Sequence, residues 1–145
     1  MKAKKNDMQN HKVRNLKGVP FFVLNKLDQA FYVSNMLYSV NLNLGGNTQE
    51  FYRHLDVSLP NVISLTNIAN KAEIGSFFTQ LNIDLDTLTM VFWSFEEPAD
   101  LFILSDLVSH WSDIFHPLAD DAWVLYIPSL GRTILFTHYG KIKFS

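Results

Sequence analysis

Two aspartates and a histidine have a spacing that suits metal binding or acid–base chemistry. Asp106, His110 and Asp113 are four and three residues apart, so a continuous helix would carry all three side chains on one face. A histidine between two carboxylates can bind a divalent metal or act as a general base. The outward face of an ordinary amphipathic helix has the same pattern, and we therefore expect no metal, cofactor or catalytic residue here.

A second acidic motif lies further along the chain. Asp120 and Asp121 directly precede an apolar segment, where paired acids could bind a cation or neutralise a basic residue of a partner. A polar turn is the simpler interpretation, because aspartate is a favoured turn residue. The candidate partner-binding residues are those for which we find no local structural role: Asp106, His110, Asp113, Asp120 and Asp121.

Other motifs are weaker. Asp84 and Asp86 form a D-x-D pair at an expected helix-to-strand junction, which is better explained as a loop than as a metal site. Residues 45–48, Gly-Gly-Asn-Thr, could hold an anion at a helix N-terminus but lack the P-loop ending. The chain has no cysteine, which excludes disulfides, thiolate zinc sites and cysteine nucleophiles.

The charge distribution points to a protein partner. Between Lys71 and Arg132 there are ten acidic residues and no Lys or Arg, and the same stretch contains Trp93, Trp111 and Trp123. Such a one-sided charge creates a negative field, which repels nucleic acid and attracts a basic partner. Aromatic residues interleaved with acids can form a protein interface. The sequence therefore predicts a protein partner with a basic surface, and no nucleic acid.

Composition predicts one folded domain behind a basic tail. Residues 1–17 carry a net charge of +5 with few apolar side chains, and we expect a flexible tail there. Residues 18–145 carry a net charge of −7 and are expected to form a single globular domain. No run approaches the ~20 apolar residues of a membrane span, and the start lacks a signal-peptide core. We expect a soluble cytoplasmic protein with no membrane contact.

Apolar periodicity predicts the elements that would position these residues. Helices are expected over 48–55, after the capping residue Asn70, and over 98–114, where Asp100 would complement the positive helix end. Strands are expected over 19–24, 36–44, 87–93, 123–127, 133–138 and 141–145, while 61–65 is a strand or an extended loop and 27–37 is ambiguous. Lys141 and Lys143 would point outward from the last strand and guard a sheet edge.

This element order favours an α+β fold. We expect a mixed or antiparallel sheet with a C-terminal β-meander, packed against two or three helices. The expected strand over 87–93 has apolar residues on both faces, so it should be central and covered on both sides.

The C-terminal end resembles a known class of proteins. The runs WSDIFHPLADDAW (111–123) and TILFTHYGKIKF (133–144) resemble the ends of some small bacterial immunity proteins. Those proteins protect a cell from its own or a neighbour's polymorphic toxin, as in contact-dependent growth inhibition. The resemblance implies a stoichiometric binder that blocks a toxin, often a nuclease with a basic substrate cleft. It supplies no motif from which residue roles could be carried over.

We therefore expect an immunity protein that acts by binding and not by catalysis. Two alternatives stay open. The first is a small metal-dependent enzyme that uses Asp106, His110 and Asp113. The second is a small-ligand-binding regulatory domain with a pocket lined by phenylalanine and tryptophan.

Overall fold

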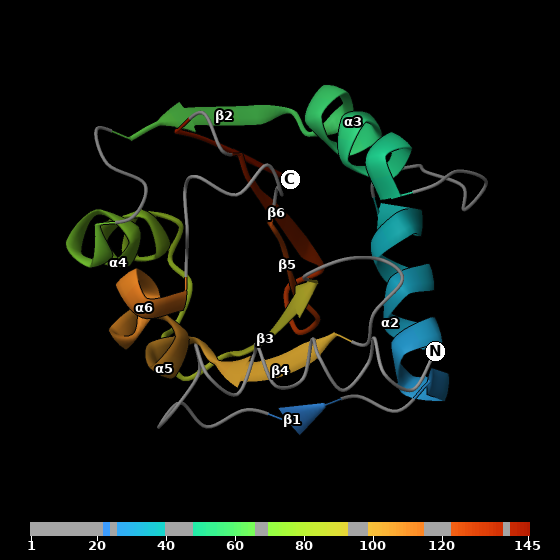
Figure 1. The fold of residues 1–145 in the computed structure, drawn as a ribbon, viewed down its shortest axis with the longest axis horizontal. Helices are drawn as coiled ribbons and strands as arrows, with labels where there is room; N and C mark the ends of the chain where they lie inside the picture. The colour runs from blue at the N-terminus through green and yellow to red at the C-terminus, as the bar shows by residue number, and fades with distance from the viewer. Residues whose placement is uncertain are drawn as a thin grey trace.

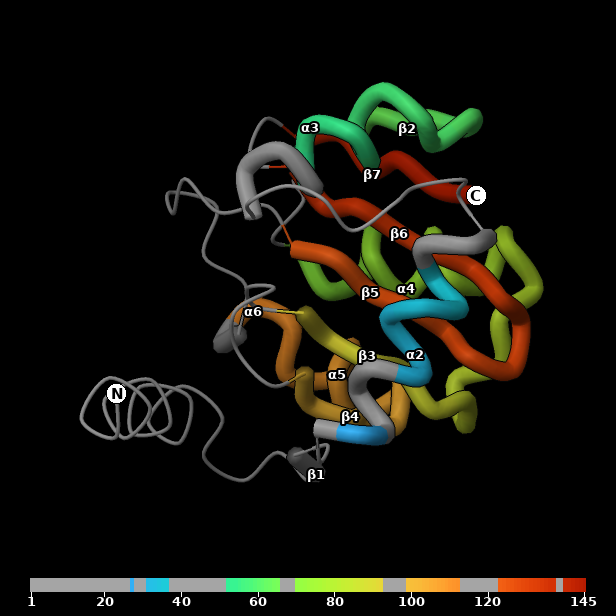
Figure 2. Tube along the Cα trace, turned by 90° about the vertical axis from the view of Figure 1, so that its right-hand side faces the viewer, coloured from blue at the N-terminus to red at the C-terminus, as the bar shows by residue number. Residues whose placement is uncertain are grey.

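The structure, a computed structural model, describes residues 22–23, 26–39, 48–65, 70–92, 99–114, 123–137 and 140–145. Seven antiparallel strands form one sheet in the order β1–β4–β3–β5–β6–β7–β2 (Figure 2). The strands are β1 Phe22–Val23, β2 Asn61–Ser64, β3 Leu88–Phe92, β4 Asp100–Ile103, β5 Trp123–Ile127, β6 Arg132–Phe136 and β7 Lys141–Phe144. The fold is α+β.

Helices cover both faces of this sheet. On one face lie α4 (Lys71–Gln80), α5 (Leu104–Ser109) and α6 (Trp111–Ile114), and on the other lie α2 (Lys26–Ser39) and α3 (Thr48–Ser58) (Figure 1). Two buried apolar clusters result, one on each face. Strand β3 contributes to both, because Val91 joins the α4–α6 cluster while Met90 and Phe92 join the α2–α3 cluster. The expectation of a central strand covered on both sides is thus confirmed.

Helix α4 follows directly from its local sequence. The Asn70 side chain accepts hydrogen bonds from the backbone N–H groups of Ala72 (2.9 Å) and Glu73 (3.2 Å), which satisfies two donors that a helix start leaves free. Its apolar stripe, which includes Ile74, Phe77 and Phe78, is buried against the sheet. The chain then turns at Asn82, which has a φ of 55°, a conformation that asparagine tolerates better than most residues.

The C-terminal meander is confirmed as strands β5, β6 and β7, which pair in sequence order. The connection from β5 to β6 runs through Pro128 and Gly131, and Gly131 has a φ of 60°, which glycine adopts without steric cost. The expected helix over 48–55 is present as the longer α3, and 61–65 contains strand β2.

The expected helix over 98–114 is wrong in its first part. Residues Asp100–Ile103 form strand β4, which pairs with β1 and β3. In a helix over 98–114 whose buried face included Leu104, Val108 and Trp111, Phe102 would have pointed to solvent. In the strand, Phe102 is buried in the α4–α6 cluster while Leu101 packs on the opposite cluster, because successive side chains of a strand point to opposite faces of the sheet. Asp100, expected at a helix start, is instead fully buried in the sheet.

The expected strand over 36–44 is wrong where the structure describes it, because residues 36–39 belong to α2. The ambiguous segment 27–37 is helical. Val33 and Met36 are buried, whereas Leu27 and Phe31 are exposed. Residues 40–44 lie outside the described part of the chain, as do residues 1–17 and all of 19–24 except β1.

The expected edge role of the C-terminal lysines is also wrong. Strand β7 lies inside the sheet between β6 and β2, so its lysines do not guard an edge. Lys141 is exposed, as expected, but Lys143 is ion-paired with Asp56 on α3. Among the described helices, none is both long enough and apolar enough to cross a membrane.

Candidate protein-binding surface

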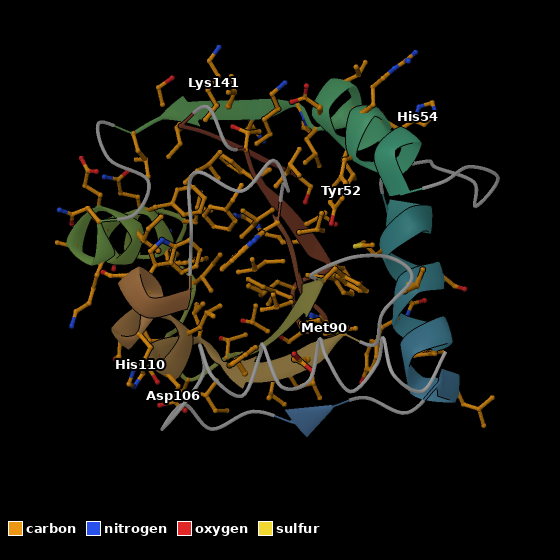
Figure 3. All side chains as sticks on the ribbon, viewed as in Figure 1. Tyr52, His54, Met90, Asp106, His110 and Lys141 are labelled. Carbon is orange, nitrogen blue, oxygen red and sulfur yellow. The ribbon has the colours of Figure 1, made fainter. Side chains whose placement is uncertain are left out.

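Two of the five candidate residues lie one turn apart on one short helix, α5. Asp106 is in the first turn of α5, and His110 ends that helix, with its backbone N–H donating to the carbonyl of Asp106 (3.2 Å). Both side chains are half-buried and lie in the helix layer on the outer side of α5 (Figure 3). The predicted proximity of these two residues is therefore seen.

The helix ends at His110, and this changes the expected three-residue face. His110 has φ −108° and ψ 18°, so the chain leaves α5 and begins α6 at Trp111. Asp113 lies in α6, but its side chain is outside what the structure describes, and so are Asp120 and Asp121. The spacing argument assumed one continuous helix, and that assumption fails at His110.

A loop from another part of the chain lies against α5, although the sequence analysis considered its two aspartates separately from Asp106. Residues 84–87, here called the acidic loop, contain Asp84 and Asp86. The backbone N–H of Leu104 donates to the carbonyl of Thr87 (2.9 Å), and that of Ser105 donates to the carbonyl of Leu85 (2.8 Å). The acidic loop therefore lies against the start of α5, and Asp84, Asp86 and Asp106 emerge from neighbouring backbone segments. These three aspartates are called the acidic surface.

The acidic loop contacts α5 because the first backbone N–H groups of that helix need hydrogen-bond acceptors. Ile103 precedes α5 and has no side chain that could accept a hydrogen bond, so the first N–H groups of the helix need other acceptors. The carbonyls of the acidic loop supply them. The loop is in turn held by Asp84, whose Oδ1 accepts from the N–H of Asp86 (3.1 Å) and whose carbonyl accepts from the N–H of Thr87 (3.1 Å). The acidic surface is thus supported by a hydrogen-bonded frame.

The acidic surface combines charge with an exposed apolar side chain. Asp84 and Asp86 are exposed, and Asp106 is half-buried. Leu85 lies between the first two and is 38% exposed. The sequence from 72 to 131 supplies no Lys or Arg to neutralise these carboxylates from within. Charged groups around an apolar contact are the usual arrangement of a protein interface.

The described part of the chain offers no metal site. No three His, Asp or Glu side chains in it lie close enough together to hold a metal ion. In the alternative enzyme site, the described residues Asp106 and His110 supply only two potential metal ligands. A carboxylate surface without a metal cluster can still attract a cationic side chain of a partner.

A groove on another part of the molecule bears on the small-ligand alternative. It has a volume of about 300 Å³ and lies between strand β2 and helix α4, lined by Ile63, Leu65, Ala72, Glu73, Ser76, Phe77 and Gln80. This volume is at the lower limit of small-molecule pockets, roughly 300–1,000 Å³. The two described tryptophans do not line this groove: Trp111 and Trp123 pack edge to face in the α4–α6 core, with ring centroids 5.8 Å apart.

Sequence reasoning missed the contribution of Asp84 and Asp86. These two residues could have been included if residues 100–103 had been predicted as a strand. Had that strand been recognised as the antiparallel neighbour of β3, the start of β3 would have been placed beside the end of β4, as in the observed pair Leu88 and Ile103. The acidic loop before β3 and the helix after β4 then necessarily meet.

Comparison with known proteins gives no relative on which to base a function. No protein-family model matches the chain, and no significant match was found among curated proteins or solved structures.

Proposed function

We propose that this chain is an immunity protein that binds a bacterial toxin domain with a basic surface and blocks it stoichiometrically in the cytoplasm. The observation that carries the proposal is the acidic surface, where the acidic loop and α5 bring together Asp84, Asp86 and Asp106. The resemblance of the C-terminal end to immunity proteins supports the same function. Asp113, Asp120 and Asp121 belong to the proposed contact on the evidence of the sequence.

Electrostatics favour a basic protein over other partners. Carboxylates gathered on one surface accelerate the approach of a positively charged partner and repel phosphate backbones. A nuclease toxin presents such a positive surface because it must bind a nucleic acid. Inhibition then follows from occupancy, since an acidic protein bound over the cleft excludes the substrate by contact and by charge.

The frame beneath the acidic surface suits tight binding. The hydrogen bonds from Leu104 and Ser105 to the acidic loop hold its backbone before a partner arrives. A preorganised surface loses less conformational freedom on association. Leu85 supplies apolar area between charges, and removing one member of a desolvated charge pair at such an interface costs about 2–5 kcal/mol.

The experiment pairs this chain with the product of its adjacent reading frame. We expect the two proteins to co-purify as a 1:1 complex and the chain to restore growth of cells that express the partner. The triple variant Asp84→Asn, Asp86→Asn, Asp106→Asn should lose protection. Asparagine at position 84 keeps the side-chain oxygen that accepts from Asp86, so the loop should remain folded.

A matched variant separates charge at this surface from charge in general. Glu73→Gln removes a carboxylate from α4, outside the acidic surface, and should protect cells as the wild type does. Full protection by the triple variant, or equal loss with Glu73→Gln, would contradict the proposal.

A further inference from the structure

Three partly exposed leucines lie at one end of the sheet, the end that carries the acidic surface. Leu88 begins β3 and is 48% exposed, and Leu130, in the turn between β5 and β6, is 51% exposed. Leu85 in the acidic loop is 38% exposed. A single exposed leucine needs no explanation, but several at one place mark an interaction surface. These three residues are called the leucine patch.

The register of the strands brings the leucine patch together. Strand β3 is antiparallel to both of its neighbours, with Leu88 opposite Ile103 of β4 and Met90 opposite Tyr126 of β5. The turn that follows Ile127 therefore leaves the sheet beside Leu88, one strand spacing or about 5 Å away. Figure 2 shows this turn on the right of the sheet, on the side where β3 begins. The acidic loop, the start of α5 and the turn are thus neighbours at one end of the sheet.

Hydrogen bonds fix the backbone segments that carry the leucine patch. In the turn, the N–H of Leu130 donates to the carbonyl of Ile127 (3.1 Å), and the N–H of Gly131 donates to the carbonyl of Pro128 (3.3 Å). In the acidic loop, the carbonyl of Leu85 is held by the start of α5. Leu88 belongs to a strand that is paired on both sides. A surface whose backbone is already fixed loses little conformational freedom when a partner binds.

We propose that the leucine patch and the acidic surface form one interface, in which the toxin domain places apolar side chains on the leucines and Lys or Arg side chains on the aspartates. This inference rests on the proposed function and gives the two parts of the interface different roles. The charges speed the approach of the partner, whereas the leucines, once covered, slow its release. An apolar region bordered by charged groups is the usual composition of a protein interface.

Charge favours a basic partner over a second copy of this chain. Asp84 and Asp86 flank Leu85 in the acidic loop, and Asp106 lies in the first turn of the helix that contacts this loop. Arg132, which begins β6 at the same end, is half-buried and is outnumbered by these three carboxylates. Two copies that met through this end would bring like charges together, which is costly. A partner with Lys or Arg around an apolar side chain meets no such repulsion.

The test measures how fast the full chain dissociates from the product of its adjacent reading frame, by surface plasmon resonance. The variants are Leu88→Ser and Leu130→Ser, made singly, and Leu130→Met, which keeps an apolar side chain in the turn. Val57→Ser is the matched control, because Val57 is 79% exposed but lies on α3, which is attached to β7 through Lys143 and Asp56. Urea unfolding followed by circular dichroism shows whether each variant is folded.

We expect each serine variant to raise the dissociation rate constant about fivefold or more, because roughly half of each leucine remains for the partner to bury. The association rate constant should stay within about twofold of wild type at every salt concentration, since no charge changes. Leu130→Met and Val57→Ser should dissociate like wild type. A variant that had only lost stability would contain less binding-competent protein but would dissociate at the wild-type rate.

Two results would overturn this inference and leave the proposed function intact. One is a wild-type complex whose dissociation rate is unchanged in both serine variants or is raised equally by Val57→Ser. The other is a concentration-dependent dimer of the free chain that Leu130→Ser abolishes, because it would assign the leucine patch to a second copy. If the wild-type chain forms no complex at all, the proposed function fails, and this inference fails with it.

Discussion

Lys143 on β7 joins Asp56 on α3 through two contacts of its ammonium group. The Nζ atom lies 2.7 Å from Oδ1 of Asp56 and donates to the main-chain carbonyl of the same residue at 2.6 Å. That carbonyl belongs to the last turn of the helix, where carbonyls lack partners and a positive charge is favourable. The contact fastens α3 to the sheet, and it explains why a lysine is found on an interior strand.

We predict that Lys143→Met lowers the free energy of unfolding by about 1 kcal/mol, because the pair is partly exposed and also includes a helix-end hydrogen bond. Urea unfolding followed by circular dichroism measures this change. In a double-mutant cycle with Asp56→Asn, the coupling energy should be positive and should shrink at high salt. Lys141→Met, on the same strand but exposed, is the control and should change stability little. Equal effects of the two lysine variants would contradict the contact.

The assignment of residues 100–103 to a strand has its own test. Phe102→Ala should destabilise the protein by about 3–5 kcal/mol, because the side chain is buried in the α4–α6 cluster. Its neighbour Ile103 is only half-buried, so Ile103→Ala should cost clearly less. Thermal and urea unfolding of both variants gives the comparison. A negligible effect of Phe102→Ala would instead fit the helix in which that side chain faces solvent.

Alkaline pH should weaken the fold through Tyr126. Burial first, and then the nearby Tyr32, raises the pKa of the Tyr126 hydroxyl above its ordinary value of 10.0. The folded state therefore holds this proton more tightly than the unfolded state does. The resulting stability is fully present below pH 10.0 and is lost as pH rises from there through the raised pKa.

The measurement for this prediction is the free energy of unfolding between about pH 8 and 11, compared with Tyr126→Phe. The wild type should lose more stability over this range than the variant, because phenylalanine has no proton to lose. Parallel curves for the two proteins would show that Tyr126 does not contribute.

The sequence correctly predicted those helices and strands whose pattern of apolar and turn residues fits only one type of secondary structure. Helix α4 has a capping asparagine and a helical stripe, and strands β5 to β7 are separated by turns that contain glycine. The α+β class follows from these elements. Strand β3 was predicted as central because apolar residues occupy both of its faces.

The errors come from patterns that fit two structures. Around Phe102, apolar residues satisfy a helical stripe and also the two-sided packing of a short strand, and only pairing with β3 decides between them. Among the described side chains of α2, Val33 and Met36 are buried, a choice fixed by how the helix lies on the sheet and not by its own period. The position of β2 outside β7 is a long-range pairing, which local sequence does not encode.

Prediction of the candidate site was limited in the same way, because local sequence does not show which distant segments lie side by side. The sequence placed Asp106 and His110 correctly on one side of a helix but separated them from Asp84 and Asp86. Those acids join the surface only because backbone donors of α5 find acceptors in the acidic loop. Such a contact between segments depends on the sheet register.

The most direct test of the proposed function is the association rate of this chain with the toxin domain encoded beside it, measured by stopped flow at increasing salt. For wild type the rate constant should fall roughly tenfold or more between low salt and about 0.5 M, as expected for electrostatic steering. The variant Asp84→Asn, Asp86→Asn, Asp106→Asn should start slower and depend less on salt, while Glu73→Gln should behave like wild type. Identical salt dependence in wild type and the triple variant would contradict a role for the acidic surface.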